Sequence, residues 1–480
     1  MEMTFSTPDM WPVLPEIFLL GMACIILIAD LFFDESRRIW THWLTLGALA
    51  GTAWLLGGQM GDPAVTTFGG MYVADTMARV LKLVAVAATA VVLIYSQDYL
   101  KSREIYQGEY YVLMLTALLG IMVMISGSNF VSLYLGLELQ SLSIYALVAL
   151  RRNDGVASEA GMKYFVLGAF ASGLLLYGMS LLYGMSGTLD IAELARWTAS
   201  ADLNAGLVMA LGFVVAGLAF KLGAVPFHMW IPDVYDGAPT AVTVFIGSAP
   251  KLASFALFMR LLVDGMQDLH DAWQPLLAGL ALLSMGIGAI VAIAQSSLKR
   301  MLAYSTISHV GFLLLGILAG TEQGYQAAMY YAITYVIMAT AGFGMILLLA
   351  RAGFEADRID DFAGLNRRSP WFALMMLFVM FGMAGVPPFV GFYAKFAVIW
   401  AALDAGYLWL AVAAVIFSVV SAYYYLRVVK VMYFDEPAGE LLRLQAAADA
   451  RTVMSVNAGL ILLLGVFPGT LMSLCVAAIG

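Results

Sequence analysis

The sequence predicts an all-α polytopic membrane protein with about fourteen transmembrane helices. Of its 480 residues, 62% are hydrophobic and only 12% are charged, whereas charged residues make up about 25% of a typical soluble domain. The mean hydropathy is +0.89. Apolar runs of about 20 residues, the length that crosses a bilayer core, fill most of the chain. These observations exclude a soluble protein with a single membrane tail.

The spans can be placed in chain order from these apolar runs. We expect them near residues 13–33, 40–58, 76–97, 110–126, 129–150, 159–184, 204–230, 238–262, 273–295, 301–320, 325–350, 370–402, 407–433 and 453–478. The segment TLDIAELARW, Thr188–Trp197, is polar and is expected to form a short interfacial helix. The expected organisation is an N-terminal three-helix segment (1–109), a first repeat (110–265), a second repeat (266–434) and a C-terminal loop with the last helix (435–480).

The distribution of basic residues predicts the orientation. With the N-terminus outside, the cytoplasmic loops hold Arg37, Arg38, Lys101, Arg103, Arg151, Arg152, Lys299, Arg300, Arg351, Arg358, Arg367, Arg368, Arg427, Lys430, Arg443 and Arg451. The opposite side holds only Arg196 and Arg260. The positive-inside rule therefore places both termini on the outer side of the membrane, which is the periplasmic side if the membrane is a bacterial inner (plasma) membrane. The acidic N-terminus does not resemble a cleaved signal peptide.

Composition also excludes several kinds of chemistry. Cys24 and Cys475 lie near opposite ends and form no CxxC pair, which argues against iron–sulfur clusters and structural zinc. No phosphate-binding or dinucleotide motif is present, and no basic patch suggests nucleic-acid binding. We expect neither a metal nor a cofactor in this chain.

Six basic residues fall inside predicted spans and differ in depth: Arg79, Lys82, Lys163, Lys221, Lys251 and Lys395. Arg79 and Lys82 lie near an outer end, where snorkelling and an i,i+4 pair between Asp75 and Arg79 suffice to explain them. Lys163 lies one turn inside a cytoplasmic end and could snorkel too. The last three are deep, and a lysine at a span centre costs about 2.5–3.5 kcal/mol, so such residues are functional by default.

Two of the deep lysines accompany a possible internal repeat. The seventh span contains KLGAVPFHMWIPD and the twelfth contains MAGVPPFVGFYAK. Asp233 lies seven residues after Pro226, as Lys395 lies seven after Pro388. The spans are five apart in order, so they cross the membrane in opposite directions and would form an inverted repeat, the arrangement that marks transport sites. The alternative is coincidence between two proline-kinked helices.

Each deep lysine has a proline nearby: Pro226, Pro250, Pro387 or Pro388. Proline frees the carbonyl four residues before it, here those of Leu222, Ile246, Met383 and Ala384. Carbonyls inside a membrane need partners. Water and an ammonium group are suitable, so each break is predicted to form a polar pocket for a buried lysine.

Other polar side chains share helical faces with this group. Tyr134, Glu138, Ser141 and Tyr145 line one face of the fifth span, and Ser305, Ser308, His309 and Phe312 one face of the tenth. His228 follows the Pro226 break. A lysine that gains and loses a glutamate partner would relay protons. The structural alternative is that a Glu138–Lys221 pair only fixes helix packing, and that the histidines are only hydrogen-bonded structure.

Three stretches carry a resemblance to a known family: FKLGAVPFHMWIPDVYDGAPTAV (Phe220–Val242), SLKRMLAYSTISHVGF (Ser297–Phe312) and GVPPFVGFYAKF (Gly385–Phe396). There the sequence resembles the antiporter-like membrane subunits of proton-pumping NADH:quinone oxidoreductase, respiratory complex I, and the resemblance covers nearly the whole chain. It implies about fourteen helices, with helices 4–8 and 9–13 as inverted five-helix repeats and helices 7 and 12 broken.

The resemblance also implies roles. Glu138, Lys221, Lys251 and Lys395 match the proton-translocating residues, Lys163 the helix 6 lysine near the glutamate, and His228 a polar residue of a hydrated axis. Flavin, iron–sulfur clusters and quinone belong to partner subunits. Subunits K and M are the implied neighbours, besides lipid, protons and water. Subunit M carries glutamate where this chain has Lys395, and the long C-terminal lateral helix of subunit L is absent.

Three functions remain as hypotheses. The first is a proton-translocating subunit that couples quinone reduction in neighbouring subunits to a buried Glu/Lys relay. The second is a subunit of a multisubunit sodium/proton antiporter, which shares much of the pattern. The third is a non-transporting membrane scaffold.

Overall fold

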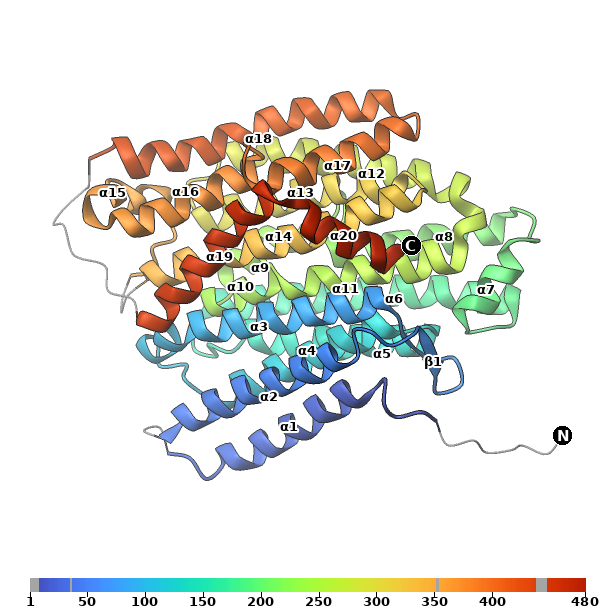
Figure 1. Cartoon of the computed structure of the whole chain (residues 1–480), viewed down its shortest axis with the longest axis horizontal. Helices are drawn as coiled ribbons and strands as arrows, with labels where there is room; N and C mark the ends of the chain where they lie inside the picture. Colours follow the sequence, from blue (N-terminus) through green and yellow to red (C-terminus); the bar gives the residue numbers. More distant parts are fainter. Residues whose placement is uncertain (1–7, 35–36, 351–353, 437–446) are drawn as a thin grey trace.

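A computed structural model describes residues 8–34, 37–350, 354–436 and 447–480. Long helices lie side by side along one common direction (Figure 1). The N-terminal segment contains α1 (Leu14–Asp30), α2 (Ile39–Gly58), β1 (Val65–Thr67), β2 (Tyr72–Ala74) and α3 (Thr76–Ser102). The next part contains α4 (Gly108–Ser126), α5 (Phe130–Val148), α6 (Gly155–Ser186), α7 (Ile191–Thr198), α8 (Ala205–Leu222), α9 (Trp230–Gly237), α10 (Thr240–Ile246), α11 (Ala249–Phe258) and the π-helix η2 (Met259–Asp264).

The second half of the chain continues the bundle. It contains η3 (Gln267–Leu269), α12 (His270–Ile293), α13 (Leu298–Leu318), α14 (Glu322–Leu349), η4 (Ile359–Phe362), α15 (Leu365–Arg368), α16 (Pro370–Ala384), α17 (Val390–Asp404) and α18 (Leu408–Phe434). The chain ends with α19 (Ala448–Val466) and α20 (Pro468–Ile479). By length and composition alone, eleven helices of the described chain could cross a membrane.

The predicted spans agree with these helices except in a few places. The polar segment after α6 forms the interfacial-type helix α7, as expected. The last predicted span is two helices, because the chain leaves helical geometry at Phe467 and Pro468 begins α20 without an N–H to donate. The antiparallel hairpin of β1 and β2 is the one sheet among the described residues, and it was not expected in an all-α chain.

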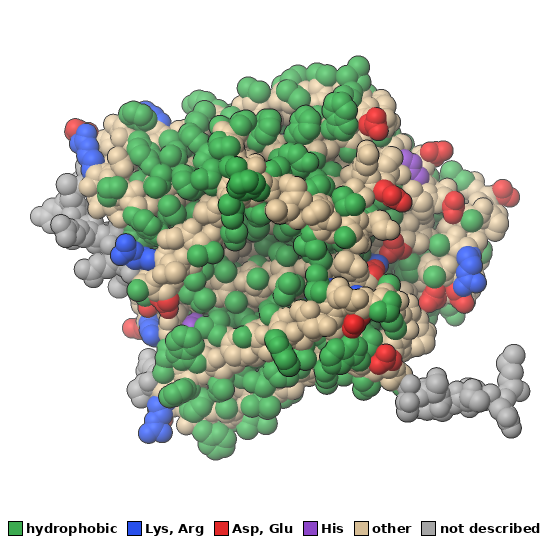
Figure 2. Space-filling view, viewed as in Figure 1, with side chains coloured by type: hydrophobic (Ala, Val, Ile, Leu, Met, Phe, Trp, Pro, Cys, Tyr) green, Lys and Arg blue, Asp and Glu red, His purple; other side chains and the backbone are tan. Residues whose placement is uncertain are grey.

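The charges separate along the helix direction. Figure 2 shows Lys and Arg mainly at the left end, Asp and Glu mainly at the right end, and an apolar belt between them. The left end carries loops that the sequence places in the cytoplasm, and α7 lies at the right end (Figure 1). This separation supports the predicted orientation. Two of the predicted cytoplasmic arginines, Arg351 and Arg443, lie outside the described residues.

The shallow basic residues of α3 are buried, and the expectation that they snorkel is wrong. Lys82 is 2% exposed and its Nζ lies 2.5 Å from Oε1 of Glu16, which is also buried. It donates to the Tyr72 hydroxyl at 2.7 Å. Arg79 donates to the carbonyls of residues 62, 63 and 74 instead of pairing with Asp75. These acceptors come from α1, from the loop before β1 and from β2, and sequence spacing along one helix cannot reveal them.

Asp75 has a different partner from the one expected. Its side chain caps α3 by accepting from the N–H of Ala78, and Nη1 of Arg260 lies 2.8 Å from its Oδ2. Burial alone would raise the pKa of the Asp75 carboxyl, but Arg260 and the Ala78 N–H outweigh burial and the pKa lies below its ordinary value. Arg260, expected on the outer side of the membrane, is buried in η2 and also pairs with Asp264.

Candidate functional site

The two proline breaks have the same local geometry. α8 ends at Leu222, and Gly223 follows with φ +90°. α16 ends at Ala384, and Gly385 follows with φ +83°. Cis peptide bonds precede Pro226 and Pro388. In Figure 1 the chain passes from α8 to α9 and from α16 to α17 in opposite directions, which fits the direction expected of an inverted pair.

A buried lysine occupies each break. Nζ of Lys251 donates to the Leu222 carbonyl at 2.8 Å, and Nζ of Lys395 donates to the Ala384 carbonyl at 3.0 Å. The two lysines are 4% and 5% exposed. These are two of the carbonyls that the prolines were predicted to free. The Leu222 carbonyl accepts from Lys251 and not from the adjacent Lys221, because the Lys251 side chain extends from α11 to the end of α8.

The other prolines differ in their surroundings. Pro250 is the second residue of α11 and lies next to the gap after α10, so the eighth predicted span is broken as well. The carbonyl of Ile246 accepts from the Tyr235 hydroxyl at 3.3 Å rather than from a lysine. Pro387 is exposed beside its cis partner Pro388. Three of the breaks in the described residues therefore lie beside the predicted prolines, and lysines bind a carbonyl at two of these three.

Glu138 and Lys221 lie close together without a direct ion pair. Nζ of Lys221 donates to the Ser141 hydroxyl at 2.9 Å, and Ser141 donates in turn to the carbonyl of Leu137. The Glu138 carboxylate acts electrostatically on Lys221, and its Oε1 is buried with no hydrogen-bond partner in the described structure. Tyr134 on the same helix face is half-buried. Ser141 therefore takes the place next to Lys221 that a direct ion pair would give to Glu138.

Lys163 and His228 are less buried than Lys251 and Lys395, and the roles that the resemblance implies for them stay predictions. The Lys163 side chain is 44% exposed and its Nζ lies 2.9 Å from both Glu159 and Asp233. It bonds α6 to Asp233 of α9, because its position in the first part of α6 brings it to the charged surface. His228 is half-buried, and its Nδ1 has no hydrogen-bond partner among the described residues.

His309 lies at the centre of a hydroxyl cluster. Its Nδ1 is 2.6 Å from the Tyr331 hydroxyl, and its Nε2 is 3.0 Å from the Tyr425 hydroxyl. Tyr425 is also bonded to Ser305. The neighbouring Ser308 is buried, and its hydroxyl has no partner in the described structure. An imidazole with a hydroxyl at each nitrogen can accept a proton on one side and release one on the other.

His309 also lies between the two buried lysines. It lines a cavity of about 10 Å³ together with Lys251, Tyr331 and Tyr335, which is room for about one water molecule. On the other side, Nζ of Lys395 lies 5.0 Å from the centre of the Phe312 ring, one turn along α13. Lys395 also donates to Ser418 of α18 at 3.2 Å.

Sequence reasoning missed several side chains that contact Lys251, His309 and Lys395. Trp230 holds Lys251 with its ring centre 5.4 Å from Nζ, and Tyr331, Tyr425 and Ser418 contact His309 or Lys395. The tyrosine-rich stretches MYYAITY and AYYYL within apolar spans were the available signal. No group of three or more metal-ligating side chains occurs in the part of the chain that the structure describes.

Comparison with known proteins identifies the fold's relatives. The model of the family described as NADH:quinone oxidoreductase/Mrp antiporter, TM, matches residues 127–421. The chain belongs to this family. A relative from Thioalkalivibrio sulfidiphilus (strain HL-EbGR7), NADH-quinone oxidoreductase subunit N, is 58% identical over 99% of this chain and 100% of its own.

Solved structures show the same similarity. A chain of respiratory complex I from Thermus thermophilus with bound aureothin matches with a TM-score of 0.84 and 30% identity, over 97% of this chain and 100% of that one. A chain of the Mrp complex from Dietzia sp. DQ12-45-1b matches with a TM-score of 0.84 at 21% identity, over 98% and 96% of the two chains. At that identity the second match shows the fold alone.

Proposed function

We propose that this chain is a subunit N of NADH-quinone oxidoreductase, that it lies in the membrane arm, and that it translocates protons. The observation that carries the proposal is the pair of buried lysines, Lys251 and Lys395, bound to the carbonyls that the two matching helix breaks free. Ionisable residues at such depth mark proton and ion pathways. The relatives named subunit N match over full length, which supports the assignment to this complex.

The proposed path follows the contacts from Glu138 to Lys395. Glu138 acts on Lys221, and Lys221 is held by Ser141. Lys251 bonds to the carbonyl of Leu222, the residue after Lys221. One water would connect Lys251 with His309 through the small cavity between them. Between His309 and Lys395, the proposed path passes Tyr425, which contacts His309, and Phe312, whose ring lies next to the Lys395 amine.

The driving energy comes from outside this chain. Moving one elementary charge against 100 mV requires about 2.3 kcal/mol. Moving a buried lysine toward or away from a carboxylate changes its protonation free energy by about 1.4 kcal/mol per pKa unit, so a change of a few units is of the right size. Partner subunits carrying flavin, iron–sulfur clusters and quinone would supply the redox step, and this chain would make and break no covalent bond.

The finer assignments belong to the same proposal. Residues 110–265 and 266–434 form the two inverted repeats, and subunits K and M are the neighbours. Both termini face the periplasm of a bacterial cell. The matching geometry after Leu222 and Ala384 supports the repeats, and the separation of charge along the bundle supports the orientation.

The second candidate is a subunit of a multisubunit sodium/proton antiporter. The similarity to the Mrp complex chain favours it at the level of the fold. The much higher identity to subunit N argues for the first candidate. A scaffold without transport is disfavoured, because nothing in helix packing requires two lysines at this depth.

The test replaces the lysines in the assembled complex. In Lys251→Met and Lys395→Met, NADH-driven proton translocation into sealed vesicles is expected to fall at least about tenfold, because methionine keeps the volume and removes the exchangeable proton. Lys430→Met on the surface of α18 (65% exposed) is the matched control and keeps full activity.

Wild-type pumping in both buried variants, with the complex assembled, would refute the relay. Proton movement that depends on sodium and persists without NADH would instead support the antiporter.

A further inference from the structure

The turn between α9 and α10 is held by residues from distant parts of the chain. Nζ of Lys299, at the start of α13, donates to the carbonyls of Asp236 at 2.9 Å and Ala238 at 3.0 Å. Ser297 donates to the Asp236 carboxylate at 3.0 Å. Lys299 is 4% exposed, so this predicted loop lysine is buried against the turn that joins α9 to α10.

The first residue of α10 is capped from outside the helix. Pro239 precedes it and provides no side-chain cap, although the first N–H groups of a helix need acceptors. The N–H of Thr240 donates to the Tyr99 hydroxyl at 3.2 Å. The Thr240 hydroxyl donates to Oε2 of Glu355 at 3.4 Å. Tyr99 comes from the end of α3, and Glu355 from the segment between α14 and η4.

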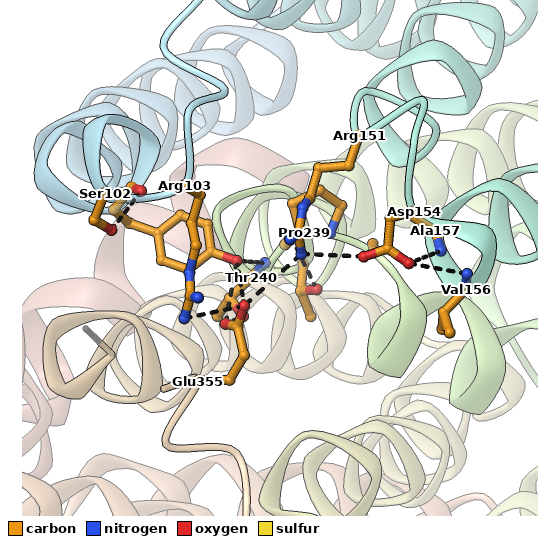
Figure 3. A network of polar contacts seen from close by, with 12 residues as sticks. Ser102, Arg103, Arg151, Asp154, Val156, Ala157, Pro239, Thr240 and Glu355 are labelled. Carbon is orange, nitrogen blue, oxygen red and sulfur yellow. Dashed lines mark hydrogen bonds and ion pairs between the residues drawn. The ribbon is translucent and has the colours of Figure 1, made fainter. Parts of the chain in front are cut away.

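Glu355 is the centre of this network (Figure 3). Tyr99 donates to it at 3.2 Å, Nη2 of Arg103 lies 3.2 Å from its Oε1, and Arg151 lies 3.9 Å from the same oxygen. A carboxylate at a helix N-terminus is stabilising. The segment carrying Glu355 is fixed to α13, because Leu298 donates to the carbonyl of Asp357 at 2.6 Å.

The helices on both sides of this turn connect it to Lys251. α9 carries Trp230, whose ring faces the Lys251 amine. α10 continues through a short break into α11, which carries Lys251 itself, and every residue of α10 and α11 is buried. Close packing transmits a shift of one end of such an element along it.

We propose that Glu355 is a positioning residue that holds the α9–α10 turn and thereby places Lys251 against Leu222 and Trp230. It links the second half of the chain to the lysine of the first half. This inference rests on the proposed function for its effect on pumping, but the holding of the turn is independent of that function.

The experiment uses the assembled complex and two readouts. Hydrogen exchange of peptides covering residues 230–246 is expected to be about tenfold faster in Glu355→Ala, because local opening becomes easier. Proton translocation per NADH is expected to fall about 2- to 30-fold, with a shifted pH profile, and Glu355→Asp should restore part of both. Asp360→Ala changes an exposed carboxylate five residues away and is the control.

Exchange and pumping equal to the control would overturn the proposal. If Glu355→Ala does not assemble, Tyr99→Phe removes the acceptor of the Thr240 N–H while keeping the ring, and the same two outcomes apply. Full pumping in Lys251→Met would refute the proposed relay instead, and the exchange data would still decide whether Glu355 holds the turn.

Discussion

At the scale of single residues, charge placement in this chain depends on what each side chain can reach. Lys163 lies close to a helix end and bonds surface carboxylates. Lys251 and Lys395 cannot reach the surface and bond backbone carbonyls instead. Lys82 instead forms an internal ion pair with Glu16, which is distant from it in the sequence. The same residue type therefore has three roles, and depth alone separates only the first from the others.

The Glu16–Lys82 pair gives a stability prediction. Lys82→Met leaves the buried Glu16 carboxylate without its cation, and breaking such a pair costs about 3–5 kcal/mol. We expect a lower thermal midpoint of the assembled complex and a smaller loss in the double variant Glu16→Met/Lys82→Met, because both charges are then removed together. Lys101→Met, at the exposed end of the same helix, is the control. An equal drop for Lys101→Met would contradict this account.

At the scale of elements, a glycine with a left-handed φ ends the helix at the breaks before Pro226 and Pro388. Gly385 allows α16 to stop so that the Ala384 carbonyl faces Lys395. A Cβ at Gly385 would lie 3.0 Å from Cδ and 3.5 Å from Nζ of that lysine. Gly406 has the same backbone conformation, with φ +86°, but a Cβ there would meet no atom within 4 Å. The two glycines thus share a left-handed φ but differ in what a side chain would touch.

This difference predicts separate effects of two like substitutions. Gly385→Ala and Gly406→Ala both force alanine into the left-handed region at a cost of about 1–2 kcal/mol. Only Gly385→Ala displaces Lys395, so proton translocation per NADH should fall in that variant alone, measured in complexes of equal assembly. Equal pumping in both variants would show that the contact between Lys395 and the break is not needed.

At the scale of the whole molecule, the separation of charge along the bundle predicts an orientation in the membrane. Basic side chains gather at one end of the bundle and acidic ones at the other (Figure 2). Arg152 lies on the predicted cytoplasmic side and Arg196 on the opposite side, and both are exposed.

Labelling can test this orientation directly. In a Cys24→Ser background, Arg152→Cys should react with a membrane-impermeant maleimide in inside-out vesicles, and Arg196→Cys in right-side-out vesicles. The reverse labelling pattern would show that the topology is inverted and that the Lys163–Asp233 ion pair lies on the periplasmic side.

Much of the site could be predicted because it depends on local chemistry. The positions of the breaks follow from proline and glycine, and the freed carbonyls of Leu222 and Ala384 follow from the hydrogen-bond pattern of a helix. Partners across helices could not be predicted this way. Tyr331 lies 22 residues after His309 in the sequence and Tyr425 lies 116 residues after it, and both contact its ring from other helices. No spacing rule predicts contact at such sequence separations.

The sequence by itself determined that this chain resides in a membrane, that helices break beside Pro226 and Pro388, and that Lys251 and Lys395 are buried, because apolar length, proline and charge act locally. Only the tertiary structure decided that Lys251 rather than Lys221 binds the Leu222 carbonyl, that Lys163 faces Asp233, and that Glu355 accepts from the Thr240 hydroxyl at the start of α10. Those contacts depend on how the helices pack together, and packing brings residues together irrespective of their separation along the chain.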